Sequence, residues 1–313
     1  MKKRIAIFGM GGVGGYLGGF LARQYPVGDS EIELIFIARG EHYNAIAASG
    51  LEMKTTLANF NAKATSVVED TSEVGVVDYI VYTTKSYDTL ASIPQLEPMI
   101  GPDTVIITFM NGVDGEEMLR EKLPQTTVWS GCAFIVSLIE KPGVIYQDGE
   151  VVKYLFGLKG GDVERMLEFE NLCSAAGLNV KYHDDIEVRV LSKLHFISAV
   201  ATFTSYSGRC TGDIMSTPEL KATLRAMMEE FSAVVAADSR ELIDDVIEKN
   251  LKTVHIMPYE STSSMQRDFA AGKRCEVEAL CGYIVHLGEK VNVPTPLYSK
   301  MYEFIKNNQN EKK

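Results

Sequence analysis

The sequence contains no apolar run long enough to cross a membrane. A membrane helix needs about 18 consecutive apolar residues, and no segment of the 313 residues reaches that length. The N-terminus combines basic and apolar residues as a signal peptide does, but its apolar run, Ile5–Phe8, ends at glycines and is too short. We therefore interpret Ile5–Phe8 as a strand and expect no membrane partner.

Cysteine is scarce in the chain, and it is not arranged for a structural role. The five cysteines form no C-x-x-C pair and have no metal-ligand spacing with any histidine. An odd number of cysteines also argues against a disulfide framework. We expect reduced thiols in a cytoplasmic protein and no metal site.

The chain has fewer basic residues than acidic ones. The chain has 31 lysines and arginines against 42 aspartates and glutamates, a net charge of −11. An acidic surface repels polyphosphates, which argues against nucleic acid or an anionic membrane as a partner. A local basic pocket can still hold a single phosphate.

The first half of the chain alternates short apolar runs with helical stretches. A predicted helix, Val13–Gln24, follows the first strand, and this alternation indicates a parallel sheet with helical crossovers. Around Val128–Tyr154, turns at Pro142-Gly143 and Asp148-Gly149 separate short strands, which predicts an antiparallel extension. The later strands of the predicted parallel sheet are Glu33–Ala38, Val76–Thr83 and Thr104–Phe109.

From about Asp185 the apolar residues recur at helical spacing. The sequence therefore predicts an α/β Rossmann-type N-terminal domain over residues 1–180 and a predominantly α-helical C-terminal domain over residues 181–313. The expected helices are Ile186–Thr204, Glu219–Val235, Ser261–Ala271, Glu276–Val291 and a last amphipathic segment.

A glycine-rich turn follows the first strand and opens the first helix. Gly9, Gly11 and Gly14 match the pattern G-x-G-x-x-G, with Gly12 as an additional glycine. In such a turn the first glycine allows a tight reversal, the second lets the backbone approach a pyrophosphate, and the third permits close helix–strand packing. With a strand before it and a helix after it, the motif predicts dinucleotide binding.

The end of the second strand indicates which dinucleotide binds. A carboxylate there usually holds the ribose 2′-hydroxyl of NAD, but this strand ends in Arg39-Gly40. A guanidinium can pair with the 2′-phosphate of NADP. We expect NADP(H) as the cofactor.

Six short segments occur along the chain in a specific order and spacing. With them the chain resembles the ketopantoate reductase (2-dehydropantoate 2-reductase) family over nearly its whole length. The resemblance implies NADPH-dependent reduction of 2-dehydropantoate to pantoate, a step in pantothenate biosynthesis. The segments are IAIFGMGGVGG, Ala38-Arg39-Gly40, Thr84-Lys85-Ser86, Met110-Asn111-Gly112-Val113, Leu191-Ser192-Lys193-Leu194, and Ser263–Asp268 with Glu276 after it.

The resemblance assigns the catalytic pair to Lys193 and Glu276. Hydride delivery to a ketone leaves an alkoxide, which an ammonium can stabilise and protonate. Apolar neighbours of Lys193 make its charged form costly, which tends to lower its pKa. Glu276 matches the acid that hydrogen-bonds the substrate hydroxyl near the nicotinamide, and Glu278, two residues on, is expected on another helix face.

The resemblance assigns binding roles to three further residues. Ser264 would bind the substrate carboxylate, although a helix N-cap is its alternative role. Asn111 would contact the cofactor near its nicotinamide and the substrate, and Lys85 would reach the cofactor or the edge of the substrate cleft. His195 lies two residues from Lys193, but we expect a packed histidine rather than an acid–base group.

The chain departs from the family where pantoate-binding asparagines are expected. Ile197 and Ala201 lie at those positions after Lys193, and Thr211 aligns with a third. Each lost amide could cost ~1–3 kcal/mol if a polar group of the substrate were left unpaired. The reaction class is therefore better supported than the substrate.

Three functions follow from these observations. The first is an NADPH-dependent 2-dehydropantoate 2-reductase, and the second is a reductase of another small 2-oxo acid. The third is a non-catalytic NADP-binding sensor, which would have no reason to keep a proton donor such as Lys193. The apolar helical faces are compatible with a homodimer but do not require one.

Overall fold

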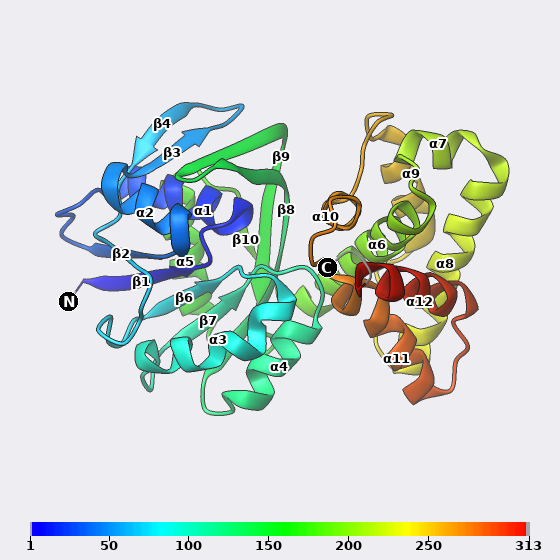
Figure 1. Cartoon of the computed structure of the whole chain (residues 1–313). Coiled ribbons are helices and arrows are strands. Elements are labelled where there is room, and N and C mark those ends of the chain that lie inside the picture. The colour runs from blue at the N-terminus through cyan, green and yellow to red at the C-terminus, as the bar shows by residue number, and fades with distance from the viewer. Residues whose placement is uncertain (1, 311–313) are drawn as a thin grey trace. The chain divides into compact units, whose positions relative to one another are not determined.

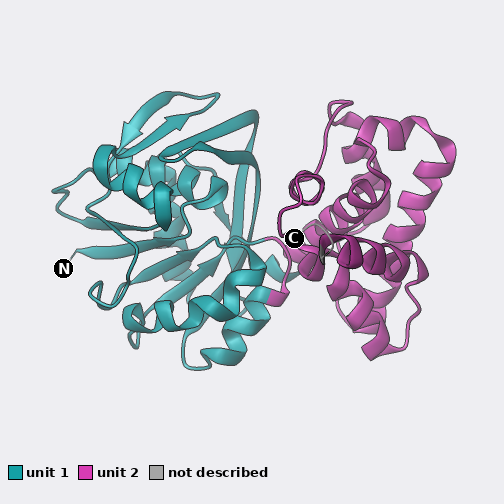
Figure 2. Cartoon of the chain, in the orientation of Figure 1, with its two compact units in different colours: residues 1–110, 115–187 teal, residues 111–114, 188–313 magenta. Residues whose placement is uncertain are grey.

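The structure, a computed structural model, describes residues 2–310. It divides into two compact units (Figure 2): residues 1–110 and 115–187 form unit 1, and residues 111–114 and 188–313 form unit 2. Residues 111–114 lie between the two segments of unit 1 in the sequence but belong to unit 2.

Unit 1 is built on a mixed sheet whose parallel part has the order β5-β2-β1-β6-β7-β8. Figure 1 labels β2, β1, β6 and β7 of this part. This strand order is that of a dinucleotide-binding Rossmann sheet, so the predicted fold class is confirmed. The central strands are almost fully buried, because helices cover a parallel sheet on both faces. The six strands are β1 (Lys3–Phe8), β2 (Ile32–Ile37), β5 (Ser66–Val68), β6 (Tyr79–Tyr82), β7 (Val105–Thr108) and β8 (Thr127–Lys141).

The predicted antiparallel extension is present, but its detail is different from the prediction. Two long strands, β8 and β9 (Val144–Gly157), pair across the Pro142-Gly143 turn. The second predicted turn, Asp148-Gly149, is wrong because it lies inside β9, where Asp148 pairs with Val136. A shift of register after Phe134 accommodates Gly149, whose φ is +82°.

Three shorter strands complete the sheet of unit 1. An antiparallel pair, β3 (Leu51–Lys54) and β4 (Asn59–Ala62), joins β9 at one edge, and β10 (Val180–Tyr182) also pairs with β9. The α-helices of this unit are α1 (Gly12–Gln24), α2 (Gly40–Ser49), α3 (Thr89–Leu96), α5 (Val163–Ala175) and α4 (Asp114–Lys122), whose first residue belongs to unit 2; the 3-10 turns are η1 (Ser86–Asp88) and η2 (Glu97–Met99).

Unit 2 is helical, as predicted. Its longest helix, α6 (Ile186–Ser207), carries Lys193, and α8 (Pro218–Ala237) packs against four other helices of the unit. The predicted helix Glu276–Val291 begins with a π-helical stretch, η3 (Glu278–Gly282), before α11 (Tyr283–Val291). The other helices are α7 (Thr211–Ser216), α9 (Val246–Ile256), α10 (Ser264–Ala270) and α12 (Pro296–Asn310).

Candidate cofactor and catalytic site

The glycine turn joins β1 to α1, and only one of its glycines faces open space. Gly9 has φ +104°, a conformation that side-chain-bearing residues rarely adopt. A Cβ on Gly12 would collide with the carbonyl of Ser137 in β8, and one on Gly14 with the carbonyl of Gly9. At Gly11 no atom lies within 4 Å of the Cβ position. The turn is therefore closed on its packed sides and open where a pyrophosphate would approach.

The N-terminus of α1 is arranged to receive an anion. Its N-cap, Gly11, has no side chain to occupy the first amides, and the first turn holds no acidic residue. Free N–H groups and the helix dipole both favour negative charge here. Together with the open face at Gly11, this arrangement fits a dinucleotide.

Two side chains that were not predicted from the sequence hold the turn in place. Thr83, which follows β6, donates its hydroxyl to the carbonyl of Gly9 at 2.6 Å. His42 of α2 donates Nε2–H to the Met10 carbonyl at 2.8 Å, and its Nδ1 accepts the N–H of Gly143 at 3.0 Å. Burial lowers the pKa of His42, which keeps the ring in the neutral form that both bonds require.

Arg39 lies at the N-cap of α2, two residues after the last residue of β2. Its guanidinium is exposed and lies 3.5 Å from a carboxylate oxygen of Asp88. The next amide, that of Gly40, donates to a carboxylate oxygen of Glu69 at 2.7 Å. The predicted phosphate-binding arginine is therefore at the expected strand end, accompanied by two acidic side chains that the sequence did not indicate.

Lys85 follows β6 and precedes the turn η1. It is half-buried, and its carbonyl accepts the amide of Asp88 at 2.9 Å. The strand ends of β1 and β6 meet at the point where ligands bind in α/β sheets, so its place in the chain agrees with a role at the cofactor.

In unit 2, Lys193 and Asn111 lie together. The ammonium of Lys193 donates to the side-chain oxygen of Asn111 at 2.9 Å. Asn111 opens the segment 111–114, whose Val113 packs on the helical core. In the same segment, the Cβ position of Gly112 lies 3.2 Å from Ala279. A loop that follows β7 in the chain thus supplies the amide that orients the lysine.

Glu276 and Glu278 have different surroundings, as helical geometry predicts. Glu276 is 3% exposed and lies just before the π-helical stretch, its carbonyl accepting the amide of Leu280 at 3.0 Å. Glu278 accepts hydrogen bonds from Tyr302 at 2.6 Å and forms an ion pair with Lys306 at 3.1 Å, both on α12. Of the two acids, Glu276 is the buried one.

At the serine-rich segment, the capping residue is Ser263. Its hydroxyl accepts the amide of Gln266 at 3.0 Å and lies 3.1 Å from the hydroxyl of Thr204 on α6. Ser264, the residue predicted to bind the substrate carboxylate, is the first residue of α10 and is half-buried. The capping alternative therefore applies to its neighbour rather than to Ser264.

The face of α6 beyond Lys193 is apolar. Ile197 and Ala201 follow Lys193 at intervals of four residues, which places them on the same side of the helix. Ile197 is half-buried against the core of unit 2, and Ala201 is fully buried. Thr211 is also buried, and its amide donates to the carbonyl of Ser261 at 3.0 Å.

His195 is a packed histidine, which confirms the expectation. It is fully buried, its Nε2 lies 3.0 Å from the carbonyl of Met228, and its Nδ1 lies 2.8 Å from the amide nitrogen of Asn250. These bonds join α6, α8 and α9, so the ring serves packing rather than proton transfer.

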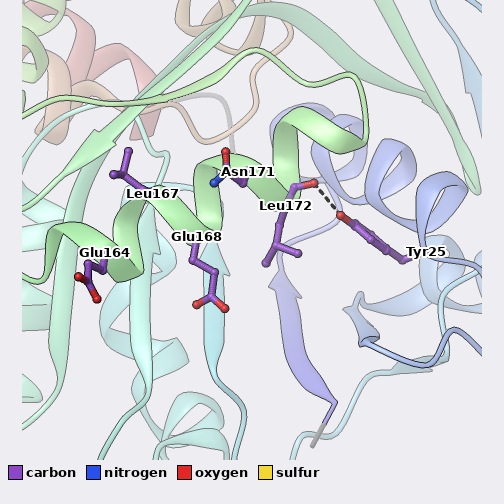
Figure 3. Close-up of a pocket in the computed structure, with 6 residues that line it drawn as sticks. All are labelled: Tyr25, Glu164, Leu167, Glu168, Asn171 and Leu172. Carbon is purple, nitrogen blue, oxygen red and sulfur yellow. Dashed lines mark hydrogen bonds between the residues drawn. The ribbon is translucent and has the colours of Figure 1, made fainter.

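A surface hollow of about 520 Å³ in unit 1 contains none of the predicted site residues (Figure 3). Tyr25 and the outer face of α5 line it, and Tyr25 donates to the carbonyl of Leu172 at 3.1 Å. Glu168, also in its lining, bonds to Lys3 and to Tyr79, the first residues of β1 and β6. The hollow therefore lies at the amino ends of the strands, whereas α/β sheets bind ligands at the carboxyl ends.

Over residues 2–310, no helix is both long and apolar enough to cross a membrane. The same residues contain no group of three or more histidine, cysteine, aspartate or glutamate side chains placed to hold a metal ion. No disulfide joins any of the five cysteines.

Comparison with known proteins gives matches over nearly the whole chain. Residues 5–158 match the family model "Ketopantoate reductase PanE/ApbA", and residues 185–309 match its C-terminal model. A 2-dehydropantoate 2-reductase structure from Porphyromonas gingivalis W83 is 33% identical with a TM-score of 0.85, covering 97% of this chain and 99% of that one.

Two further relatives are similar over the full length. The uncharacterized oxidoreductase YkpB of Bacillus subtilis is 26% identical, covering 99% of this chain and 100% of the relative. A D-mandelate dehydrogenase solved with NADH and anilino(oxo)acetate has a TM-score of 0.85, covering 99% of each chain; at 22% identity it shows a shared fold.

Proposed function

The chain belongs to the ketopantoate reductase family of oxidoreductases, and from this premise we propose that it is an NADPH-dependent 2-dehydropantoate 2-reductase. The reaction converts ketopantoate to pantoate, a step in pantothenate biosynthesis. The observation that carries the proposal is the hydrogen bond between Lys193 and Asn111, because it fixes a proton-donating ammonium in a partly buried position. A nicotinamide dinucleotide is the cofactor of the family fold, and Arg39 supports its phosphorylated form.

The bound cofactor supplies the hydride, and the chain supplies charge stabilisation and a proton. Addition of a hydride to a carbonyl carbon would leave negative charge on the carbonyl oxygen. The Lys193 ammonium stabilises this charge and then protonates the alkoxide. The side-chain oxygen of Asn111 can only accept from the ammonium, so it favours the charged lysine and limits its rotation.

The other site residues bind and orient. Glu276, buried beside the helical core, accepts a hydrogen bond from the substrate hydroxyl, and Ser264 binds the substrate carboxylate. Asn111 would contact the substrate and the cofactor near its nicotinamide, and Lys85 would reach the cofactor or the edge of the substrate cleft. These roles follow the family resemblance residue by residue, and the burial of Glu276 supports its role over that of Glu278.

A second candidate keeps the chemistry and changes the substrate. Ile197 and Ala201 make the helix face beyond Lys193 apolar, which favours a small 2-oxo acid with an apolar side chain. A panel of 2-oxo acids, followed by loss of NADPH absorbance, separates the two. Turnover of 2-dehydropantoate well above the other acids supports the first candidate. Turnover of a different acid alone replaces the substrate, and NADPH binding without any turnover favours the sensor.

We further propose that the protein acts in the cytoplasm as a homodimer. An odd number of cysteines without disulfides agrees with a reducing compartment. Sedimentation velocity at micromolar concentration tests the assembly, and a single species of monomer mass contradicts it.

A further inference from the structure

The end of β2 offers two donors to the adenosine ribose of a dinucleotide. They are the guanidinium of Arg39 and the backbone N–H of Gly40 at the start of α2. In a site selective for NADP, both kinds of donor are directed at the 2′-phosphate, which is a dianion at neutral pH. What surrounds these two donors therefore decides how strongly the site selects the phosphate.

Each donor is already engaged by a carboxylate. Glu69, which follows β5, accepts from the Gly40 amide at 2.7 Å, and Asp88, in the turn after β6, lies 3.5 Å from the Arg39 guanidinium. The two acids come from strands on either side of β1 and β2, and they converge on one strand end. A phosphate bound by both donors would have to displace both carboxylates or tolerate them nearby.

The electrostatic consequence differs between the two dinucleotides. A carboxylate repels the 2′-phosphate, but it accepts a hydrogen bond from the 2′-hydroxyl of NAD. The alternative is that Asp88 helps NADP by holding Arg39 in place. That benefit is small, because the arginine side chain is 58% exposed and the pair lies at the limit of hydrogen-bonding distance.

We propose that Asp88 and Glu69 determine cofactor choice at this site by opposing the attraction of Arg39 for a 2′-phosphate, so that the protein uses NADH as well as NADPH. This inference rests on the proposed function, since it requires a nicotinamide dinucleotide at the glycine turn. With Asp88 and Glu69 opposing the phosphate, we expect the protein to discriminate weakly between NADPH and NADH rather than to prefer NADPH strongly.

The test is to measure the Kd of NADPH and of NADH from the fluorescence of the reduced nicotinamide, with the full-length protein. In the native protein the two Kd values should differ by less than about 30-fold, since exposed charges are worth little each. Asp88→Asn should tighten NADPH by about 3- to 10-fold and leave NADH nearly unchanged, and Glu69→Gln should act in the same direction. Glu164→Gln, on α5 at the amino ends of the strands, removes the same charge as a control and should change neither Kd.

Four outcomes overturn the inference, and one of them also rejects the proposed function. Discrimination against NADH greater than about 30-fold, or weaker NADPH binding in Asp88→Asn, would show that the acids do not oppose the phosphate. A change in the Kd of NADPH in Glu164→Gln as large as that in Asp88→Asn would show an effect of net charge alone. If neither dinucleotide binds the native protein, the proposed function fails together with this inference.

Discussion

At the scale of single residues, the hydrogen bond between Lys193 and Asn111 holds the proposed proton donor in place. The Lys193 ammonium donates to the side-chain oxygen of Asn111 at 2.9 Å. An amide oxygen accepts this bond without carrying a full charge of its own. The bond therefore orients the lysine for the proposed stabilisation of an alkoxide.

Substitution of the lysine is the direct residue-level prediction. Lys193→Ala should lower kcat by about 100-fold or more, the usual scale for a general acid. The Kd of NADPH should remain close to its native value, because the cofactor turn lies in the other unit. Steady-state kinetics and a fluorescence titration measure both. A variant with near-native kcat would remove the lysine from the mechanism.

Arg39 gives a second prediction at this scale. Arg39→Ala should weaken NADPH by about tenfold more than NADH, since the guanidinium pairs with the 2′-phosphate that only NADPH carries. Comparing the two Kd values in the variant checks it. Equal losses for both cofactors would contradict the assignment of Arg39 to the phosphate.

At the scale of elements, different glycines of the turn between β1 and α1 serve packing and cofactor binding. Gly11→Ala adds a methyl group into open space, so the free energy of unfolding should change by less than about 0.5 kcal/mol. The same methyl group obstructs the approach of the pyrophosphate, so dinucleotide affinity should fall. Urea unfolding and a cofactor titration measure the two effects.

Gly12→Ala is the matched variant one residue along. Its methyl group would meet the Ser137 carbonyl of β8, and such overpacking costs about 1–3 kcal/mol. We expect lower stability here and not in Gly11→Ala. If Gly11→Ala bound the cofactor with native affinity, the pyrophosphate would not approach at that position.

The junction of α6, α8 and α9 predicts a pH dependence of stability. Burial lowers the pKa of His195 to about 4, against an unfolded value near 6.5. Between these values the unfolded chain binds a proton that the folded protein does not, so stability should fall as the pH falls through this window, by about 3 kcal/mol in total. His195→Gln should flatten this slope in urea unfolding from pH 7 to 4. An unchanged slope would assign the dependence to other groups.

The elements also differ in how far they were predictable from the sequence. The β1–turn–α1 unit was predictable because its glycine spacing is local in the chain. The long hairpin was not, because Asp148-Gly149 has the composition of a turn and only its pairing with Val136 reveals a continuous strand. Glu69 and Asp88 were not predicted for the same reason: their approach to Gly40 and to Arg39, respectively, depends on strand order rather than on sequence spacing.

At the scale of the whole molecule, the chain combines a Rossmann-type unit with a helical unit that carries the proposed proton donor, Lys193. The sequence predicted both, and it also predicted Lys193 and Asn111 as site residues. It did not predict that the segment 111–114 groups with the helical unit, because that assignment depends on contacts distant in the chain. Through this segment, a loop that follows β7 in the chain accepts a hydrogen bond from Lys193 of α6.

In the proposed reaction, hydride passes from the nicotinamide to the carbonyl carbon of a 2-oxo acid. The most direct measurement uses NADPH carrying deuterium at the transferred position of the nicotinamide, with 2-dehydropantoate as substrate and mass spectrometry of the product. We expect pantoate with one deuterium at C2, formed by the native protein and almost absent with Lys193→Ala. Pantoate without deuterium, or no pantoate from a protein that binds NADPH, would contradict it.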